Sequence, residues 1–178
     1  MIRAKTLLLA LLLILAAAGC TATEDTNDDP NPADSNDDAQ IYAVAIRKIH
    51  SFARSSGVMY LVTTTEDLVY IEAPTAPSQK LPAELQEAIT AELADERFEL
   101  IWIETFDDAP IDPTNGEIAE GDGIVITLGN IHPQEDGSVQ LSFFMTCADM
   151  CGFGKTYVLN QNYGAWQITG SVGPEIAS

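Results

Sequence analysis

The chain has 178 residues, enough for one small domain and a short accessory segment. It carries 27 Asp and Glu against 8 Lys and Arg, which gives a formal net charge of -19 at pH 7. Nucleic-acid binding depends on Lys and Arg that neutralise phosphates, so this charge excludes DNA and RNA as partners. The same charge disfavours adsorption to anionic lipid, so any membrane attachment has to be hydrophobic or covalent.

The first residues have the pattern of an export signal. Arg3 and Lys5 give a basic start, and an uncharged apolar run follows at residues 7–18. A membrane-spanning helix needs about 20 apolar residues, so the short run favours a cleaved signal over an uncleaved anchor. We therefore expect residues 1–19 to be a signal peptide.

The end of this run, Leu-Ala-Ala-Ala-Gly-Cys at residues 15–20, resembles the lipobox of bacterial lipoproteins, with Ala17 where a large aliphatic residue is usual. The resemblance implies cleavage after Gly19 and a thioether-linked diacylglycerol on Cys20, with further acylation by chains such as palmitate. Several acyl chains anchor a protein stably, whereas one holds it marginally. Thr21, in place of an inner-membrane retention Asp, implies the outer membrane if the cell has two. Ordinary secretion with Cys20 unmodified is the alternative.

Residues 20–38 are expected to comprise the lipidated cysteine and a disordered acidic tether. Beyond Cys20 the segment is rich in Asp, Asn and Pro and contains no Lys, Arg or large apolar residue. Such a composition cannot bury enough apolar surface to fold alone. Its like charges favour an extended spacer of at most about 60 Å.

From Ala39 onward the pattern predicts a single globular domain, residues 39–178. Apolar residues recur at three- and four-residue spacing in two segments, which indicates amphipathic helices. Runs of β-branched and aromatic residues between Gly, Pro and Asp turns indicate strands. The expected helices are 39–54 and 81–93, and the expected strands in this half are 58–65, 68–72 and 98–104.

The C-terminal half predicts a β-meander, because its strands follow one another through short connections that only antiparallel neighbours permit. Two helices with one apolar stripe each are best buried on one face of a sheet, so we expect an α+β fold with both helices on a curved antiparallel sheet. The terminal hairpin pattern from Tyr157 to Ile168 resembles cystatin-like and NTF2-like folds. The expected strands are 123–130, 139–147, 155–161 and 165–170.

Cys147 and Cys151 flank three residues at a hairpin between two expected strands. With Cys20 lipidated, the remaining cysteines are even in number, and an exported protein meets an oxidising compartment. A disulfide between Cys147 and Cys151 is therefore our first interpretation.

A copper site and a redox-active dithiol are alternatives for the same two cysteines. The segment Cys-Ala-Asp-Met-Cys-Gly resembles the C-x3-C-G copper loop of cytochrome oxidase, in which soft thiolates select copper. Lys155 stands where that pattern has His, and the chain has only His50 and His132. We expect both histidines to be structural, His50 at a helix edge and His132 in a turn.

An acidic loop follows the strand at 98–104. Carboxylates at this density are the hard oxygen ligands that Ca²⁺ prefers, so a calcium-binding surface protein is one hypothesis and a solvated loop another. The calcium candidates are Asp107, Asp108, Asp112, Glu117, Glu120 and Asp122.

The sequence contains none of three common catalytic motifs: it has no G-x-S-x-G elbow, no His-Glu-x-x-His and no Gly-rich phosphate loop. It therefore gives little support to an enzymatic function. We therefore expect a non-catalytic domain that binds a protein or small ligand, without a cofactor, on an envelope lipoprotein outside the cytoplasm. An envelope copper or thiol-redox protein is the alternative. The strong negative charge favours a monomer through mutual repulsion.

Overall fold

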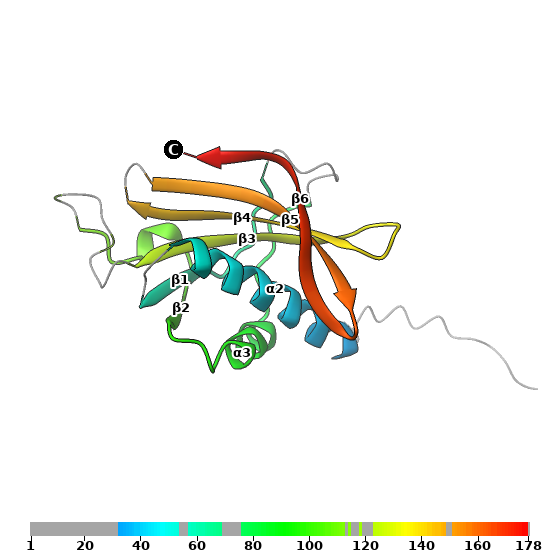
Figure 1. The fold of residues 1–178 in the computed structure, drawn as a ribbon. Helices are drawn as coiled ribbons and strands as arrows, with labels where there is room; N and C mark the ends of the chain where they lie inside the picture. Colours follow the sequence, from blue (N-terminus) through cyan, green and yellow to red (C-terminus); the bar gives the residue numbers. More distant parts are fainter. Residues whose placement is uncertain are drawn as a thin grey trace, which may run out of the picture. The chain divides into compact units, whose positions relative to one another are not determined.

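The structure is a computed structural model that describes residues 32–53, 57–68, 76–112, 114, 118, 123–148 and 151–177. This part of the chain has the expected α+β fold, with two α-helices on a six-stranded sheet (Figure 1). The helices are α2 (Pro32–Ala53) and α3 (Ala83–Glu92), with a 3-10 turn η1 (Phe106–Asp108). The strands are β1 (Val58–Val62), β2 (Glu99–Ile103), β3 (Ile124–Pro133), β4 (Val139–Ala148), β5 (Cys151–Asn162) and β6 (Ala165–Ala177).

The sheet has the order β2-β1-β3-β4-β5-β6. The four strands from β3 to β6 form the predicted antiparallel meander. The expectation of an antiparallel sheet throughout is wrong, because β1 pairs in parallel with both β2 and β3. The segment that joins β1 to β2 contains α3, and such a crossover allows the two strands to run in the same direction. The strand expected at 68–72 lies outside the described residues except for Leu68, which is not in a strand.

Helix α2 begins at Pro32, seven residues before the expected start at Ala39. The last part of the expected disordered tether, residues 32–38, is therefore helical. Once the apolar stripe from Ala39 onward has formed a helix, each further residue adds a hydrogen bond without a second nucleation cost. Proline also suits the first helical position, where its missing N–H has no acceptor to lose.

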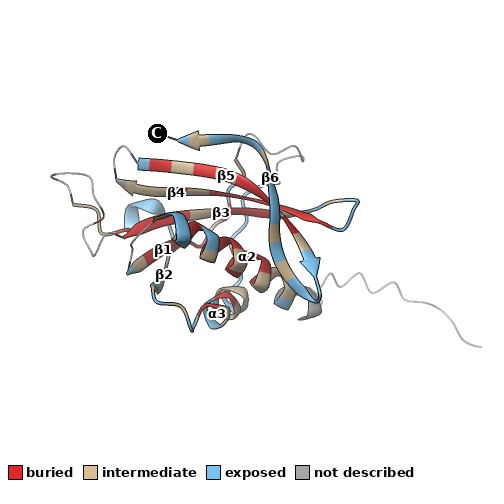
Figure 2. Cartoon of the chain, viewed as in Figure 1, coloured by how far each residue is buried: buried red, intermediate tan, exposed pale blue. Residues whose placement is uncertain are grey.

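The main hydrophobic core lies between the sheet and α2, as the burial pattern in Figure 2 shows. Ile46 and Ile49 of α2 and Phe143 of β4 are fully buried in it. A second, smaller core covers the opposite face of β1 and β2, where Tyr60 and Val62 pack against Ala109, Ile118 and other apolar side chains. Both faces of the sheet near β1 are therefore covered, which explains why β1 is almost continuously apolar.

Candidate functional site

Cys147 and Cys151 form a disulfide, as predicted, with their Cα atoms 5.3 Å apart. The bond joins the end of β4 to the start of β5, where Ala148 lies opposite Cys151. The cysteines therefore lock the end of a hairpin. Cys20 lies outside the described residues, so its lipidation stays a prediction.

Replacing both Cys147 and Cys151 by Ser should lower the free energy of unfolding by about 1 to 2 kcal/mol, because closing so short a loop removes little entropy from the unfolded chain. Urea unfolding of the oxidised wild type and the double variant measures the difference. Wild-type protein kept in a reductant is the matched control and should lose a similar amount. A loss of about 4.7 kcal/mol or more, the size expected for a closed loop of ~100 residues, would contradict this account.

The structure separates His132 from the cysteines that the copper hypothesis requires. His132 lies in β3, not in the expected turn, and pairs with Gln140 of β4. Cys147 is seven residues further along β4, about 23 Å away at the usual rise of a strand. His132 and Cys147 therefore do not form one ligand set. His50 instead packs its ring against that of Phe98, at 4.6 Å between centroids.

The described part of the acidic loop uses its carboxylates in local turns. Asp108 accepts hydrogen bonds from the amide and hydroxyl of Thr105, at 2.8 and 3.1 Å. Asp112 accepts the same pair from Thr114, and these bonds lower the pKa of the Asp112 carboxyl. Asp107 lies in η1 beside Asp108. The other calcium candidates, Glu117, Glu120 and Asp122, lie outside the described residues.

A metal centre does not form within the part of the chain that the structure describes. There, no three side chains of His, Cys, Asp or Glu come close enough to hold one ion. The calcium hypothesis involves residues beyond that part and stays a prediction.

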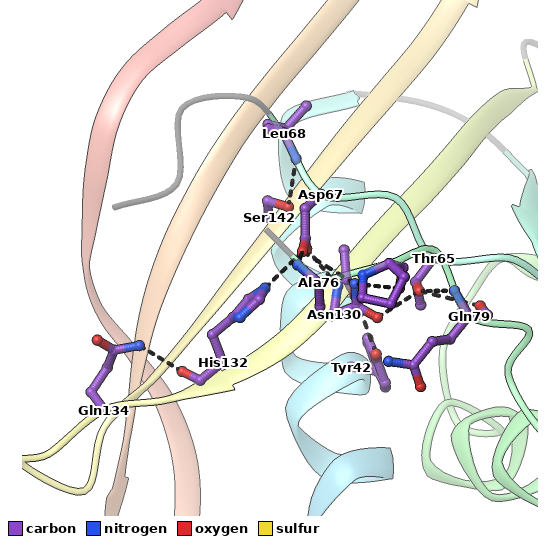
Figure 3. Close-up of polar contacts among 12 residues, drawn as sticks. Tyr42, Thr65, Asp67, Leu68, Ala76, Gln79, Asn130, His132, Gln134 and Ser142 are labelled. Atoms are coloured by element: carbon purple, nitrogen blue, oxygen red, sulfur yellow. Dashed lines mark hydrogen bonds and ion pairs between the residues drawn. The ribbon is translucent and has the colours of Figure 1, made fainter. Parts of the chain in front are cut away.

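Among the described residues, a polar cluster surrounds Asp67 (Figure 3). It lies beside Ser142 of β4, whose neighbours Leu141 and Phe143 point to the main core, so side-chain alternation puts the cluster on the other face of the sheet. The Asp67 side chain is only 2% exposed, and its two oxygens accept four hydrogen bonds. Asn130 donates two of these, from its backbone amide at 2.8 Å and its side-chain amide at 3.1 Å. The amide of Ala76 donates the third at 3.0 Å, and His132 Nε2 lies 2.8 Å from Oδ2.

The electrostatics of Asp67 follow from these contacts. Burial raises the pKa of the Asp67 carboxyl, but the hydrogen bonds from Asn130, Ala76 and His132 outweigh burial and hold the pKa below its ordinary value. A carboxylate can only accept, so the contact with His132 places a proton on Nε2 of that ring. Asp67 is therefore a buried, ionised and fully hydrogen-bonded group.

Other residues between β1 and α3, the segment that contains Asp67, add further hydrogen bonds to the Asp67 cluster. The Thr65 hydroxyl donates to Asn130 Oδ1 at 2.7 Å and accepts from the amide of Gln79 at 3.0 Å. The amide of Leu68 donates to the hydroxyl of Ser142, which is fully buried on β4. These bonds attach both ends of the loop to β3 and β4 (Figure 3).

The chemistry of the Asp67 cluster is that of a structural anchor. A His beside an Asp resembles the base of a hydrolytic triad, but a triad needs an accessible nucleophile. The nearby Ser142 hydroxyl has 0% exposure and already accepts a backbone hydrogen bond. Among the described residues, the cluster therefore offers no group that a substrate can reach for covalent chemistry.

The sequence interpretation missed this cluster. The sequence patterns did not single out Asp67 as a site residue, and His132 was expected to lie in a turn. Asp67 is separated in the chain from Asn130 by 63 residues and from His132 by 65 residues, so no local motif joins them. The one local signal was an acidic pair, Glu66 and Asp67, a few residues after an apolar strand, and that signal is too common to be used alone.

A shallow groove lies between α3 and the edge strand β2. It has a volume of about 460 Å³ and is lined by one face of α3, from Ala83 to Ala91, by Ala94 just beyond the helix, and by Trp102 of β2. The indole nitrogen of Trp102 donates to the Thr90 hydroxyl at 3.1 Å, so the ring is fixed beside the helix. Ala91 and Ala94 are exposed in the groove, which gives it a mainly apolar wall.

Comparison with known proteins identifies no relative. No family model matches the chain, and neither a curated protein nor a solved structure matches it. Neither described helix is both long enough and apolar enough to cross a bilayer. A functional assignment therefore depends on the residues themselves.

Proposed function

We propose that this chain is a lipoprotein of the bacterial cell envelope, anchored through diacylglycerol on Cys20. Its folded domain acts outside the cytoplasm as a non-catalytic module that binds a protein or small ligand. The proposal combines the lipobox at residues 15–20 with the chemistry of the folded domain.

The disulfide between Cys147 and Cys151 is the observation that carries the proposed location. Disulfides persist in exported proteins and are rare in the reducing cytoplasm. Both cysteines lie at a partly open hairpin end, since Cys151 is exposed. A cytoplasmic reductant would reach this bond, so its presence supports a chain that works after export.

The distribution of polar groups supports a binding role over a catalytic one. The buried Asp67 carboxylate is occupied by four internal hydrogen bonds that attach a loop. The groove beside Trp102, in contrast, offers apolar surface that no described residue fills. Exposed apolar concavities of this kind are typical of binding sites.

Replacing Cys20 by Ser should move the protein from the membrane fraction to the soluble envelope or the medium, because the proposed anchor is covalent lipid on that sulfur. Fractionation after a high-salt wash and incorporation of labelled palmitate measure the effect. Thr21→Ser is the matched control and should leave the protein in the membrane fraction. A Cys20→Ser protein that still sediments with membranes would show that the anchor is not lipid on Cys20.

A further inference from the structure

We propose that the free edge of β2 and the adjacent groove bind an extended segment of a partner protein as an added strand. In this segment, apolar residues alternate with Lys or Arg. The inference rests on the proposed function, since it identifies the surface and the partner chemistry of that binding module.

The backbone of β2 has the geometry that strand addition requires. Within the described residues β2 pairs only with β1, so it forms one edge of the sheet. The Glu99 amide donates to Gly57 O at 2.7 Å, and Ile103 O accepts from the Thr63 amide at 2.8 Å. Because backbone groups alternate in direction along a strand, these bonds turn the N–H and C=O of Leu100 and Trp102 away from β1. Such groups are a template for another strand.

The groove defines which side chains an added strand has to carry. Leu100 and Trp102 lie on the same face of the sheet as the helices, where both pack against the main core. A residue added beside Trp102 with its side chain on that face enters the groove between the indole ring and α3. The small side chains of Ala91 and Ala94 leave room there for an apolar group. Side chains of a strand alternate between faces, so the apolar positions occur at every second residue.

Charge defines the remaining positions of the partner segment. Four exposed carboxylates near the groove and β2 have no salt-bridge partner among the described residues: Glu84, Glu87, Asp95 and Glu99. Residues 83–104 contain seven Asp or Glu and a single basic residue, Arg97. Lys or Arg between the apolar positions would project to the opposite face of the sheet, the face of Glu99, which alternates with Leu100 along β2. The field of the other carboxylates would attract these cations at longer range. A second copy of this chain, with its own charge of -19, would be repelled.

A synthetic peptide tests this surface directly. The probe is a blocked peptide about as long as β2, in which Leu alternates with Lys, labelled for fluorescence anisotropy. The protein is the full chain in micelles of a neutral detergent, and protein-free micelles give the background. We expect saturable binding that weakens as salt is added, because salt screens exposed charges. Binding should also slow hydrogen exchange at the amides of Leu100 and Trp102.

Two variants separate the groove from general electrostatics. Ala91→Arg fills the groove and adds a positive charge at an exposed helical position, so it should weaken peptide binding at least tenfold. Ala165→Arg makes the same change at an exposed position of β6, the opposite edge strand, and should leave the affinity unchanged. Equal effects of the two variants, or no effect of Ala91→Arg, would overturn the proposal.

Two methylated peptides test the backbone pairing without altering the protein. N-methyl groups on the Leu residues and N-methyl groups on the Lys residues block opposite backbone edges of the strand. Strand addition uses only one of these edges, so one methylated peptide should lose binding and the other retain it. Equal binding of both peptides, or of neither, would overturn strand addition.

The anchor and the binding surface are tested by different measurements. A chain that fractionates with membranes through Cys20 but does not bind the peptide would overturn the strand-addition proposal alone. A chain that binds the peptide through the groove but is not released by Cys20→Ser would overturn the proposed anchor alone.

Discussion

Replacing Asp67 by Ala should lower the free energy of unfolding by about 3 to 5 kcal/mol, because several buried donors would lose their acceptor at once. The orphaned groups are the amides of Ala76 and Asn130, the Asn130 side chain and the His132 ring. Urea unfolding at neutral pH measures the loss. Asp136→Ala is the matched control, since Asp136 also accepts a backbone and a hydroxyl hydrogen bond from Ser138 but in an exposed turn. It should lose clearly less.

The pH dependence of unfolding tests the same carboxylate in a second way. The pKa of Asp67 is held below its ordinary value of 3.8, so the folded state binds the proton more weakly than the unfolded state does. Its contribution to stability is therefore complete above the unfolded pKa and is lost as the pH falls through the folded pKa. The wild type should lose this contribution below about pH 4. An Asp67→Ala curve parallel to that of the wild type at acid pH would contradict this assignment.

Replacing Gly129 by Ala should cost about 2 to 3 kcal/mol, because β3 passes too close to its neighbours to accept a side chain. An added Cβ would be 2.9 Å from Asp67 Oδ1 and 3.1 Å from the backbone oxygen of Ser142, and it would overlap the Ser142 hydroxyl. The backbone carbonyl of Gly129 also accepts the hydroxyl of Tyr42, whose pKa is raised by burial. The same substitution therefore disturbs both faces of the sheet at one point.

Gly170→Ala is the matched control for Gly129→Ala. Gly170 also lies in a strand, and a Cβ added there meets nothing within 4 Å. Chemical denaturation should show little change for Gly170→Ala and a large loss for Gly129→Ala. Similar losses at the two positions would indicate a general cost of alanine in these strands and would refute a specific close contact at Gly129.

The fold class was predictable because each element carries its own periodicity. The helix expected at 81–93 and the strand at 98–104 match α3 and β2 closely, and the meander follows from short connections. The parallel pairing of β1 was not predictable, since Met59 meets Ile124 across 65 residues with no turn to define it. The helical start at Pro32 was hidden because helix propagation from a packed stripe outweighs an unfavourable acidic composition.

The candidate sites differ in how far local sequence reveals them. The disulfide was predictable because a spacing of four residues on a hairpin meets the geometric requirement by itself. The Asp67 cluster needs β1, β3, β4 and the loop before α3 to assemble before any contact exists. The groove beside Trp102 depends on α3 folding back beside β2. Such sites form only through tertiary packing, so no local sequence motif identifies their residues.

The position of β1 between two parallel partners affects how the chain folds during synthesis. β1 is made before either neighbour, and it is apolar on both faces. Its partner Ile124 follows Met59 only after 65 further residues have been made. Until then, β1 has at most the short edge strand β2 beside it and lacks its link to the meander. Each strand of the later meander, in contrast, receives a neighbour almost at once. In the nascent chain, the apolar surface of β1 therefore stays exposed for longer than that of the later strands. A chaperone that binds unfolded chains would be needed most at β1.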